Sequence, residues 1–151
     1  MERIPDPRVR ERLERHIDDY GYDLSCDVQC YVDDRFALAI ECKAYTEVAM
    51  LKRIMVDATL LRGEFPSLRF VLFQLESQLG GDYSQLANPP TGSPSAHTVM
   101  SRFEVIVEVI TLLGGERRVD QPIHREEFFK ELTAASLAVA VVRMGNLLPK
   151  P

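Results

Sequence analysis

An alternating pattern of apolar side chains between residues 24 and 42 constrains the fold of this chain more than any other feature. Apolar residues occupy every second position in two runs, and a polar segment at 33–35 separates the runs. Alternate side chains of a strand point to opposite faces, so two such runs around a short turn predict a β-hairpin. The apolar positions are Leu24, Cys26, Val28, Cys30 and Val32, followed by Phe36, Leu38, Ile40 and Cys42.

The register of this hairpin follows from keeping its apolar positions on one face. If residues 33–35 form the turn, the numbers of paired residues sum to 68, whereas a two-residue turn mixes the polar and apolar faces. The predicted apolar pairs are Val32 with Phe36, Cys30 with Leu38, Val28 with Ile40 and Cys26 with Cys42. On the opposite face, Asp27 then lies across from Glu41, with Lys43 beside them.

A helix is predicted on the N-terminal side of the hairpin. Asp6 is a suitable N-cap, Pro7 suits the first helical position, and Gly21 can end the helix. Apolar residues recur at helical spacing between these limits, at Val9, Leu13, Ile17 and Tyr20. The pattern indicates one amphipathic helix with a solvated side.

A crossover unit is predicted after the hairpin. Thr46 can cap a helix whose apolar residues recur over 48–61 and which closes at Gly63. The nearly continuous apolar run 68–75 is typical of a buried central strand, parallel to the second hairpin strand.

The remainder of the chain completes one domain, residues 1–151. The segment 77–97 is predicted as a long loop with one turn of helix at most, 104–113 as a strand and 125–145 as a closing helix. The expected fold class is therefore α/β: an αββαβ core with a mixed sheet flanked by helices, and a C-terminal strand and helix.

Composition excludes several classes of protein. No apolar run approaches about 18 residues, so no membrane association is expected, and the N-terminus lacks the apolar stretch of a signal peptide. Three cysteines without a second ligand cluster favour reduced thiols in a cytoplasmic protein. The formal net charge of -5 gives no general basic character for nucleic-acid binding, so clustered local cations would have to provide it.

Two facing carboxylates need an explanation, because like charges directly opposite each other destabilise a sheet. One explanation is a divalent cation held by Asp27 and Glu41, with Lys43 orienting water or offsetting charge on a phosphate. The alternative is an ordinary solvated face. Ala37 and Ala39 precede Glu41 on the same face, and an alanine-lined face is expected to be covered by a helix.

The stretch from Asp27 to Lys43, DVQCYVDDRFALAIECK, resembles the active-site hairpin of the PD-(D/E)xK nuclease superfamily, the restriction endonuclease-like fold. The resemblance spans residues 6–75 in motif and element order. The proline that often precedes the aspartate is replaced by Cys26.

The resemblance implies a Mg²⁺-dependent nuclease, with Mn²⁺ as a substitute, that hydrolyses phosphodiester bonds in DNA. It favours an endonuclease of the restriction or repair type over an exonuclease. It implies that Asp27 and Glu41 are metal ligands, that the Cys42 carbonyl is a third ligand, and that Lys43 is the catalytic lysine. Glu14 of the first helix is the candidate for an additional catalytic carboxylate. A homodimer or a larger partner protein would supply further contacts to DNA.

Several interpretations stay open at this point. The alternative function is a catalytically silent nuclease-fold module that binds nucleic acid or assembles with protein. Lys52 and Arg53 could touch the phosphate backbone or simply form a solvated helix face. Gln74 could reach the metal site or satisfy a buried backbone group, and the pair at 117–118 could form a local basic strip with Arg125.

Overall fold

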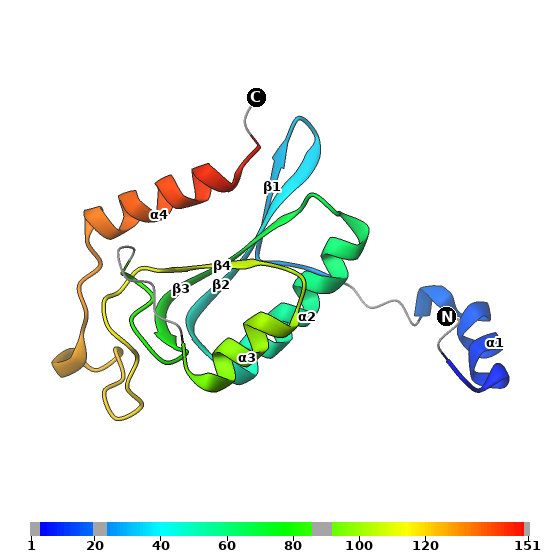
Figure 1. Cartoon of the computed structure of the whole chain (residues 1–151), viewed down its shortest axis with the longest axis horizontal. Coiled ribbons are helices and arrows are strands. Elements are labelled where there is room, and N and C mark those ends of the chain that lie inside the picture. The colour runs from blue at the N-terminus through cyan, green and yellow to red at the C-terminus, as the bar shows by residue number, and fades with distance from the viewer. Residues whose placement is uncertain (1–3, 20–23, 86–91, 150–151) are drawn as a thin grey trace.

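The computed structural model describes residues 4–19, 24–85 and 92–149 (Figure 1). Its helices are α1 (Pro7–Arg15), α2 (Val48–Glu64), α3 (Pro94–Arg102) and α4 (Ala134–Leu147), with short 3-10 helices at Ile17–Asp19 and Glu126–Phe128. Its strands are β1 (Val28–Val32), β2 (Arg35–Glu47), β3 (Arg69–Gln78) and β4 (Val107–Thr111). The chain is an α/β protein, as predicted.

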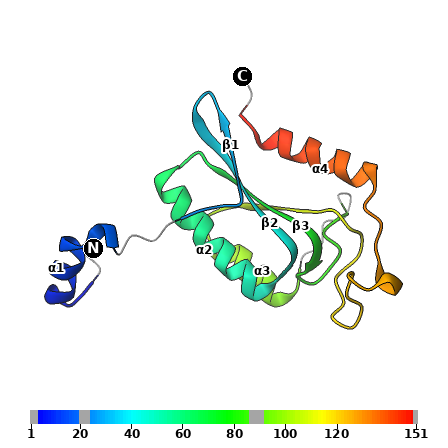
Figure 2. The same ribbon diagram turned by 180° about the vertical axis from the view of Figure 1, so that it is seen from behind.

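The four strands form one mixed sheet in the order β1-β2-β3-β4. β1 is antiparallel to β2, whereas β2, β3 and β4 run parallel. Helices α2 and α3 lie on one face of the sheet and α4 lies on the other (Figures 1 and 2). The predicted crossover from β2 through α2 to a parallel, buried β3 is therefore confirmed.

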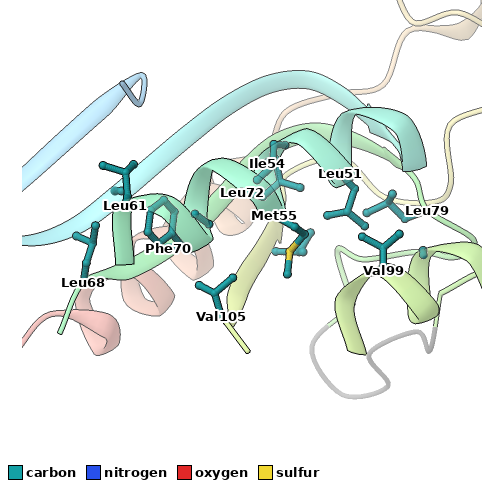
Figure 3. Close-up of a cluster of buried hydrophobic side chains, with 14 residues drawn as sticks. Leu51, Ile54, Met55, Leu61, Leu68, Phe70, Leu72, Leu79, Val99 and Val105 are labelled. Atoms are coloured by element: carbon teal, nitrogen blue, oxygen red, sulfur yellow. The ribbon is translucent and has the colours of Figure 1, made fainter. Parts of the chain in front are cut away.

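The larger hydrophobic cluster lies between the sheet and the helices α2 and α3. Leu51 and Met55 of α2 pack with Phe70 and Leu72 of β3 and with Val99 of α3 (Figure 3). A smaller cluster on the α4 side contains Leu38, Ile40, Val71, Ile110, Leu112 and Ala140. Both faces of β2 and β3 are thus covered over the N-terminal part of these strands, which explains their almost continuous apolar sequence.

The hairpin register is as predicted at its base and different at its tip. Val28 pairs with Ile40 and Cys30 with Leu38, so paired numbers sum to 68 there. Beyond Cys30 the register shifts by one, and Val32 faces Arg35 instead of Phe36. The predicted three-residue turn is wrong.

The physical reason is a β-bulge combined with a tighter turn. The turn has two residues, Asp33 and Asp34, both with positive φ (49° and 60°), as hairpins with two-residue loops favour. Ala37 is the extra residue between the partners of Cys30 and Tyr31. Turn and bulge together use as many residues as the predicted turn, so the register at the base is preserved.

Several element boundaries differ from the sequence prediction. β1 begins at Val28 rather than at Leu24. Glu47 rather than Thr46 precedes α2, because β2 continues through Glu47 and Thr46 is fully buried within it. α2 also continues through Gly63 to Glu64.

Two helices differ more strongly from the prediction. α3 occupies part of the segment predicted as loop, and its start is fixed by Ser93, whose Oγ accepts a hydrogen bond from the Ala96 N–H at 3.2 Å. The closing helix α4 begins at Ala134 instead of Arg125, after Thr133 accepts a hydrogen bond from the Ser136 N–H. In both cases a capping hydroxyl that favours a helix start was overlooked.

The first helix forms with its predicted cap but ends early. The Asp6 carboxylate accepts a hydrogen bond from the Arg8 N–H at 2.9 Å, and α1 ends at Arg15. The predicted terminal residues Tyr20 and Gly21 lie outside the described residues. None of the residues of α1 is buried, and the helix lies away from the sheet (Figures 1 and 2).

A helix that spans a bilayer needs about 20 apolar residues. None of the helices within the described ranges meets this requirement.

Two glycine substitutions are expected to have opposite effects on stability. Gly80 has φ of +92°, and a Cβ there would lie 2.2 Å from the Ser93 nitrogen, so Gly80→Ala should destabilise the fold by more than about 1 kcal/mol. Gly63 lies in α2 with open space around its Cβ position, so Gly63→Ala should stabilise it by up to about 1 kcal/mol. Urea unfolding followed by circular dichroism measures both; equal effects would contradict the described backbone at Gly80.

Candidate active site

The base of the hairpin brings the side chains of Asp27, Glu41 and Lys43 together. The Lys43 Nζ lies 2.5 Å from Glu41 Oε1 and 3.4 Å from Asp27 Oδ2. Glu41 and Lys43 are largely shielded, with side chains 26% and 31% exposed, while Asp27 is half-exposed. Two carboxylates from the two arms of the hairpin therefore point at one position, which the ammonium group occupies.

Asp27 is held in place by the backbone of the neighbouring strand. It lies immediately before β1, where the ladder of backbone pairs has ended, and its Oδ2 accepts a hydrogen bond from the Cys42 N–H at 2.7 Å. The carboxylate thus satisfies a strand N–H that has no backbone partner in the hairpin. The same carboxylate oxygen lies 3.4 Å from the Lys43 Nζ, which places it beside Glu41 and Lys43.

The position of Glu41 along β2 depends on the residues before it. Ala39 is completely buried in the cluster beneath α2, as expected for an alanine-lined face covered by a helix. From Glu41 onward the same face is only partly covered. The small side chain of Ala39 leaves room for the helix, and the charged residues follow where the face is less covered.

These charged side chains line a cleft of about 420 Å³ between the hairpin base and α2. The hairpin contributes Leu24, Ser25, Cys26, Asp27, Glu41 and Lys43. Helix α2 contributes Met50, Arg53, Ile54 and Asp57. The cleft is open and carries charged groups on both walls, so an anionic chain together with a cation could enter it.

Charge attraction keeps Lys43 in its cationic form. Burial alone would lower the pKa of Lys43, but its hydrogen bonds and its attraction to Glu41 and Asp27 outweigh burial and raise that pKa. Lys43 is therefore an ammonium group at neutral pH and acts as a hydrogen-bond donor or charge, not as a base, in this arrangement.

The two thiols near the cluster are held in their neutral form. Burial, aided by the negative charges of Asp27 and Glu41, raises the pKa of both Cys26 and Cys42. All three cysteines are free, and the side chain of Cys42 is exposed, not in the core as the alternation predicted. Neutral thiols are poor nucleophiles, and hard cations such as Mg²⁺ prefer oxygen ligands, so the Cys42 carbonyl suits such an ion better than its sulfur.

Glu14 does not join the other predicted site residues. It is exposed on α1, which lies away from the hairpin (Figure 1), whereas Asp27, Glu41, Cys42 and Lys43 are brought together. The sequence pattern placed Glu14 beside the apolar face of a helix expected to pack on the core. The apolar face of α1 is not buried in the described structure. The helical spacing of its residues therefore gave no information on the distance between Glu14 and the hairpin.

Two residues that the sequence analysis set aside or overlooked line the cleft. Arg53 was considered together with Lys52, either as a contact to the phosphate backbone or as part of a solvated helix face, and Asp57 was not considered. Their signal was the spacing i, i+3, i+4, i+7 from Met50, which places them on one face of α2. Only the position of that face opposite the hairpin makes the spacing informative.

Gln74 and Arg117 have structural contacts. Gln74 is buried and its Nε2 donates to Thr111 Oγ1 at 3.0 Å, so it bonds a side chain and not a buried backbone group. Arg117 stacks on the ring of Tyr45 and donates to the side chain of Gln78 at 2.7 Å. The Arg117 side chain is thus engaged in contacts within the fold, which argues against a local basic strip formed by residues 117–118 and Arg125.

The cluster offers a small set of protein ligands. Within residues 4–19, 24–85 and 92–149, no group of three or more His, Cys, Asp and Glu side chains could hold a metal ion. A cation bound here would have two carboxylates, and water, backbone or substrate oxygens would have to supply the remaining ligands. This incomplete set is the kind that Mg²⁺ commonly uses in phosphate chemistry.

Comparison with known proteins relates the chain to a restriction enzyme. It is 49% identical over 142 residues to the Type II restriction enzyme DdeI of Desulfomicrobium norvegicum. The match covers 93% of this chain but 59% of the relative, so the chain spans less than two thirds of that protein's length. No family model and no solved structure matches. Over nearly all of its own length the chain is thus similar to a type II restriction enzyme, which agrees with its resemblance to the restriction endonuclease-like PD-(D/E)xK nucleases.

Proposed function

We propose that this chain is a nuclease that uses a divalent metal ion to hydrolyse phosphodiester bonds within DNA. The observation that carries the proposal is the convergence of Asp27 and Glu41 on one position in an open cleft, with Lys43 beside them. The relationship to a protein named as a type II restriction enzyme supports DNA as the substrate and internal cleavage as the reaction.

The donor atoms of the cluster fit Mg²⁺, with Mn²⁺ as its substitute. Hard divalent cations prefer carboxylate and carbonyl oxygens, and both carboxylates already lie around a single cationic group. The N–H of Cys42 points towards Asp27, and the carbonyl of a strand residue faces the same side as its N–H. Asp27, Glu41 and the Cys42 carbonyl are therefore the proposed ligands.

Lys43 has two roles in this proposal. Without a metal ion its ammonium neutralises the two carboxylates, which relieves their mutual repulsion. If Asp27 and Glu41 held a divalent ion, the ammonium would be free to donate hydrogen bonds to the attacking water or to the phosphate oxygens. An ammonium group at this place would stabilise negative charge that develops in the transition state.

The chemistry divides between the ion and the chain. A bound divalent ion would polarise the phosphate and lower the pKa of a coordinated water. Asp27 and Glu41 hold that charge in the cleft, and the hydrogen bond from Cys42 keeps Asp27 in position. Cleavage of both strands of a duplex would require two such clefts, and a homodimer or a larger partner protein is the proposed way to provide them.

Metal binding is predicted to depend on the two carboxylates and not on the lysine. Adding Mn²⁺ should raise the melting temperature of the wild type, since an ion at 100 times its dissociation constant stabilises a folded protein by about 2.7 kcal/mol. Asp27→Ala and Glu41→Ala should abolish this shift. Lys43→Ala should bind Mn²⁺ at least as tightly as the wild type, because the competing ammonium is gone. Calorimetric titration measures the affinities directly.

An acidic residue outside the cleft provides the matched control for this experiment. Glu127 is exposed and lies outside the cleft, so Glu127→Ala should leave the Mn²⁺ response unchanged. A response that survives in Asp27→Ala and Glu41→Ala would contradict the proposed ligands.

DNA cleavage is predicted to require all three residues of the cluster. With Mg²⁺ or Mn²⁺ and plasmid DNA, Lys43→Ala should lower the single-turnover rate by about 100-fold or more, as expected when a group that stabilises transition-state charge is removed. Asp27→Ala and Glu41→Ala should be at least as inactive. Lys52→Ala, an exposed lysine outside the cleft, is the control and should retain the wild-type rate.

The two assays together distinguish the nuclease from a catalytically silent module. Mn²⁺ binding without cleavage of any DNA tested would contradict the nuclease proposal. If Lys43→Ala cleaves DNA at the wild-type rate, the chain is still a nuclease, but the proposed mechanism at this cluster is contradicted.

A further inference from the structure

We propose that Arg53 of α2 binds a phosphate of the DNA backbone in the cleft, and that Asp57 positions its guanidinium group. The proposal rests on the proposed function in that it takes the cleft as the DNA site. It assigns the wall opposite the carboxylate cluster, for which the comparison gives no role.

The placement of Arg53 follows from one face of α2. Met50, Arg53, Ile54 and Asp57 are spaced i, i+3, i+4 and i+7, and all four line the cleft across from the hairpin base. Ile54 is buried and anchors this face in the core. The orientation of the helix thus directs the arginine to the same cleft as Asp27, Glu41 and Lys43.

Asp57 holds the arginine while leaving most of its donors available. The Arg53 Nε lies 3.7 Å from Asp57 Oδ2, with the arginine side chain 81% exposed and the aspartate 26% exposed. Among the described residues the guanidinium has no other charged partner and no hydrogen-bond acceptor. A guanidinium that lies beside a single carboxylate keeps its other N–H groups available as a fork that matches phosphate oxygens.

The two cations that line the cleft, Lys43 and Arg53, differ in how far nearby carboxylates offset their charge. Lys43 is engaged by both carboxylates of the cluster, so its charge is already neutralised. Among the residues that the structure describes, Arg53 is the other cation that lines the cleft, and its guanidinium faces solvent. Since the whole chain carries a formal charge of -5, attraction of a polyanion must come from such local cations.

Asp57 is better explained as a positioning residue than as a metal ligand. Its carboxylate is paired with Arg53, and it does not form a group of three acidic side chains with Asp27 and Glu41 within the described ranges. If Asp57 positions Arg53, the change in DNA affinity on Asp57→Asn has the opposite sign to the change expected from charge repulsion alone. Removing a negative charge near DNA should strengthen binding, whereas releasing Arg53 should weaken it.

The test measures binding of a fluorescently labelled DNA duplex in EDTA, so that neither metal binding nor cleavage is required. Affinity is determined by anisotropy at salt concentrations between about 50 and 200 mM. Loss of one phosphate contact should reduce the slope of log affinity against log salt by about 0.9. We expect this reduction for Arg53→Ala, a largely retained slope for Arg53→Lys, and weaker binding for Asp57→Asn.

The matched control is the neighbouring residue Lys52. It carries the same charge one position earlier on α2 and is exposed, but it does not line the cleft. Lys52→Ala should therefore leave the slope unchanged. Melting temperatures of all variants establish that each is folded.

Three results would overturn the proposal. These are an unchanged slope in Arg53→Ala, an equal reduction in Lys52→Ala, and no measurable binding of DNA by the wild type. Tighter binding by Asp57→Asn would retain Arg53 but remove the positioning role of Asp57. The nuclease proposal is tested separately, by the cleavage assay. If the salt slope depends on Arg53 but the protein cleaves no DNA with Mg²⁺ or Mn²⁺, the phosphate contact is supported and the nuclease proposal is contradicted.

Discussion

The hydrogen bond from the Cys42 N–H to the Asp27 carboxylate is the contact on which the geometry of the cleft depends. It forms where the β1–β2 ladder stops, so a side-chain oxygen takes the place of a backbone partner. Asp27 is thereby tied to the strand that carries Glu41 and Lys43. Without this bond the aspartate would belong to an unpaired segment before β1, and the two carboxylates would have no fixed separation.

The second constraint is the packing of α2 on the sheet. Ala39 and the buried face of α2 bring helix and strand together, and the same helix then presents Arg53 and Asp57 to the cleft. The cluster on the hairpin and the pair on the helix are thus placed by one crossover unit. The hydrophobic core that stabilises this unit also fixes the distance between the two charged walls.

The hairpin shows how far sequence reasoning can reach. Alternation located the strands and the register at Val28 and Cys30, because a slip of one residue would expose an apolar face. It did not reveal the bulge at Ala37, since a two-residue turn with a bulge and a three-residue turn use the same number of residues. Glu14 could not be placed either, because helical spacing defines a face of α1 but not what that face packs against.

The sequence by itself determined the α/β class, the hairpin, the crossover and the convergence of Asp27, Glu41 and Lys43, because these follow from periods of two and 3.6 residues and from strand pairing. Only the tertiary structure decided which helix lies across from the cluster. Contacts between Arg53 or Asp57 and the cleft depend on the orientation of α2 over the sheet, which is set by packing among Leu51, Met55 and Leu72. No local sequence pattern predicts the orientation of α2, because it depends on packing among many residues that are far apart in the sequence.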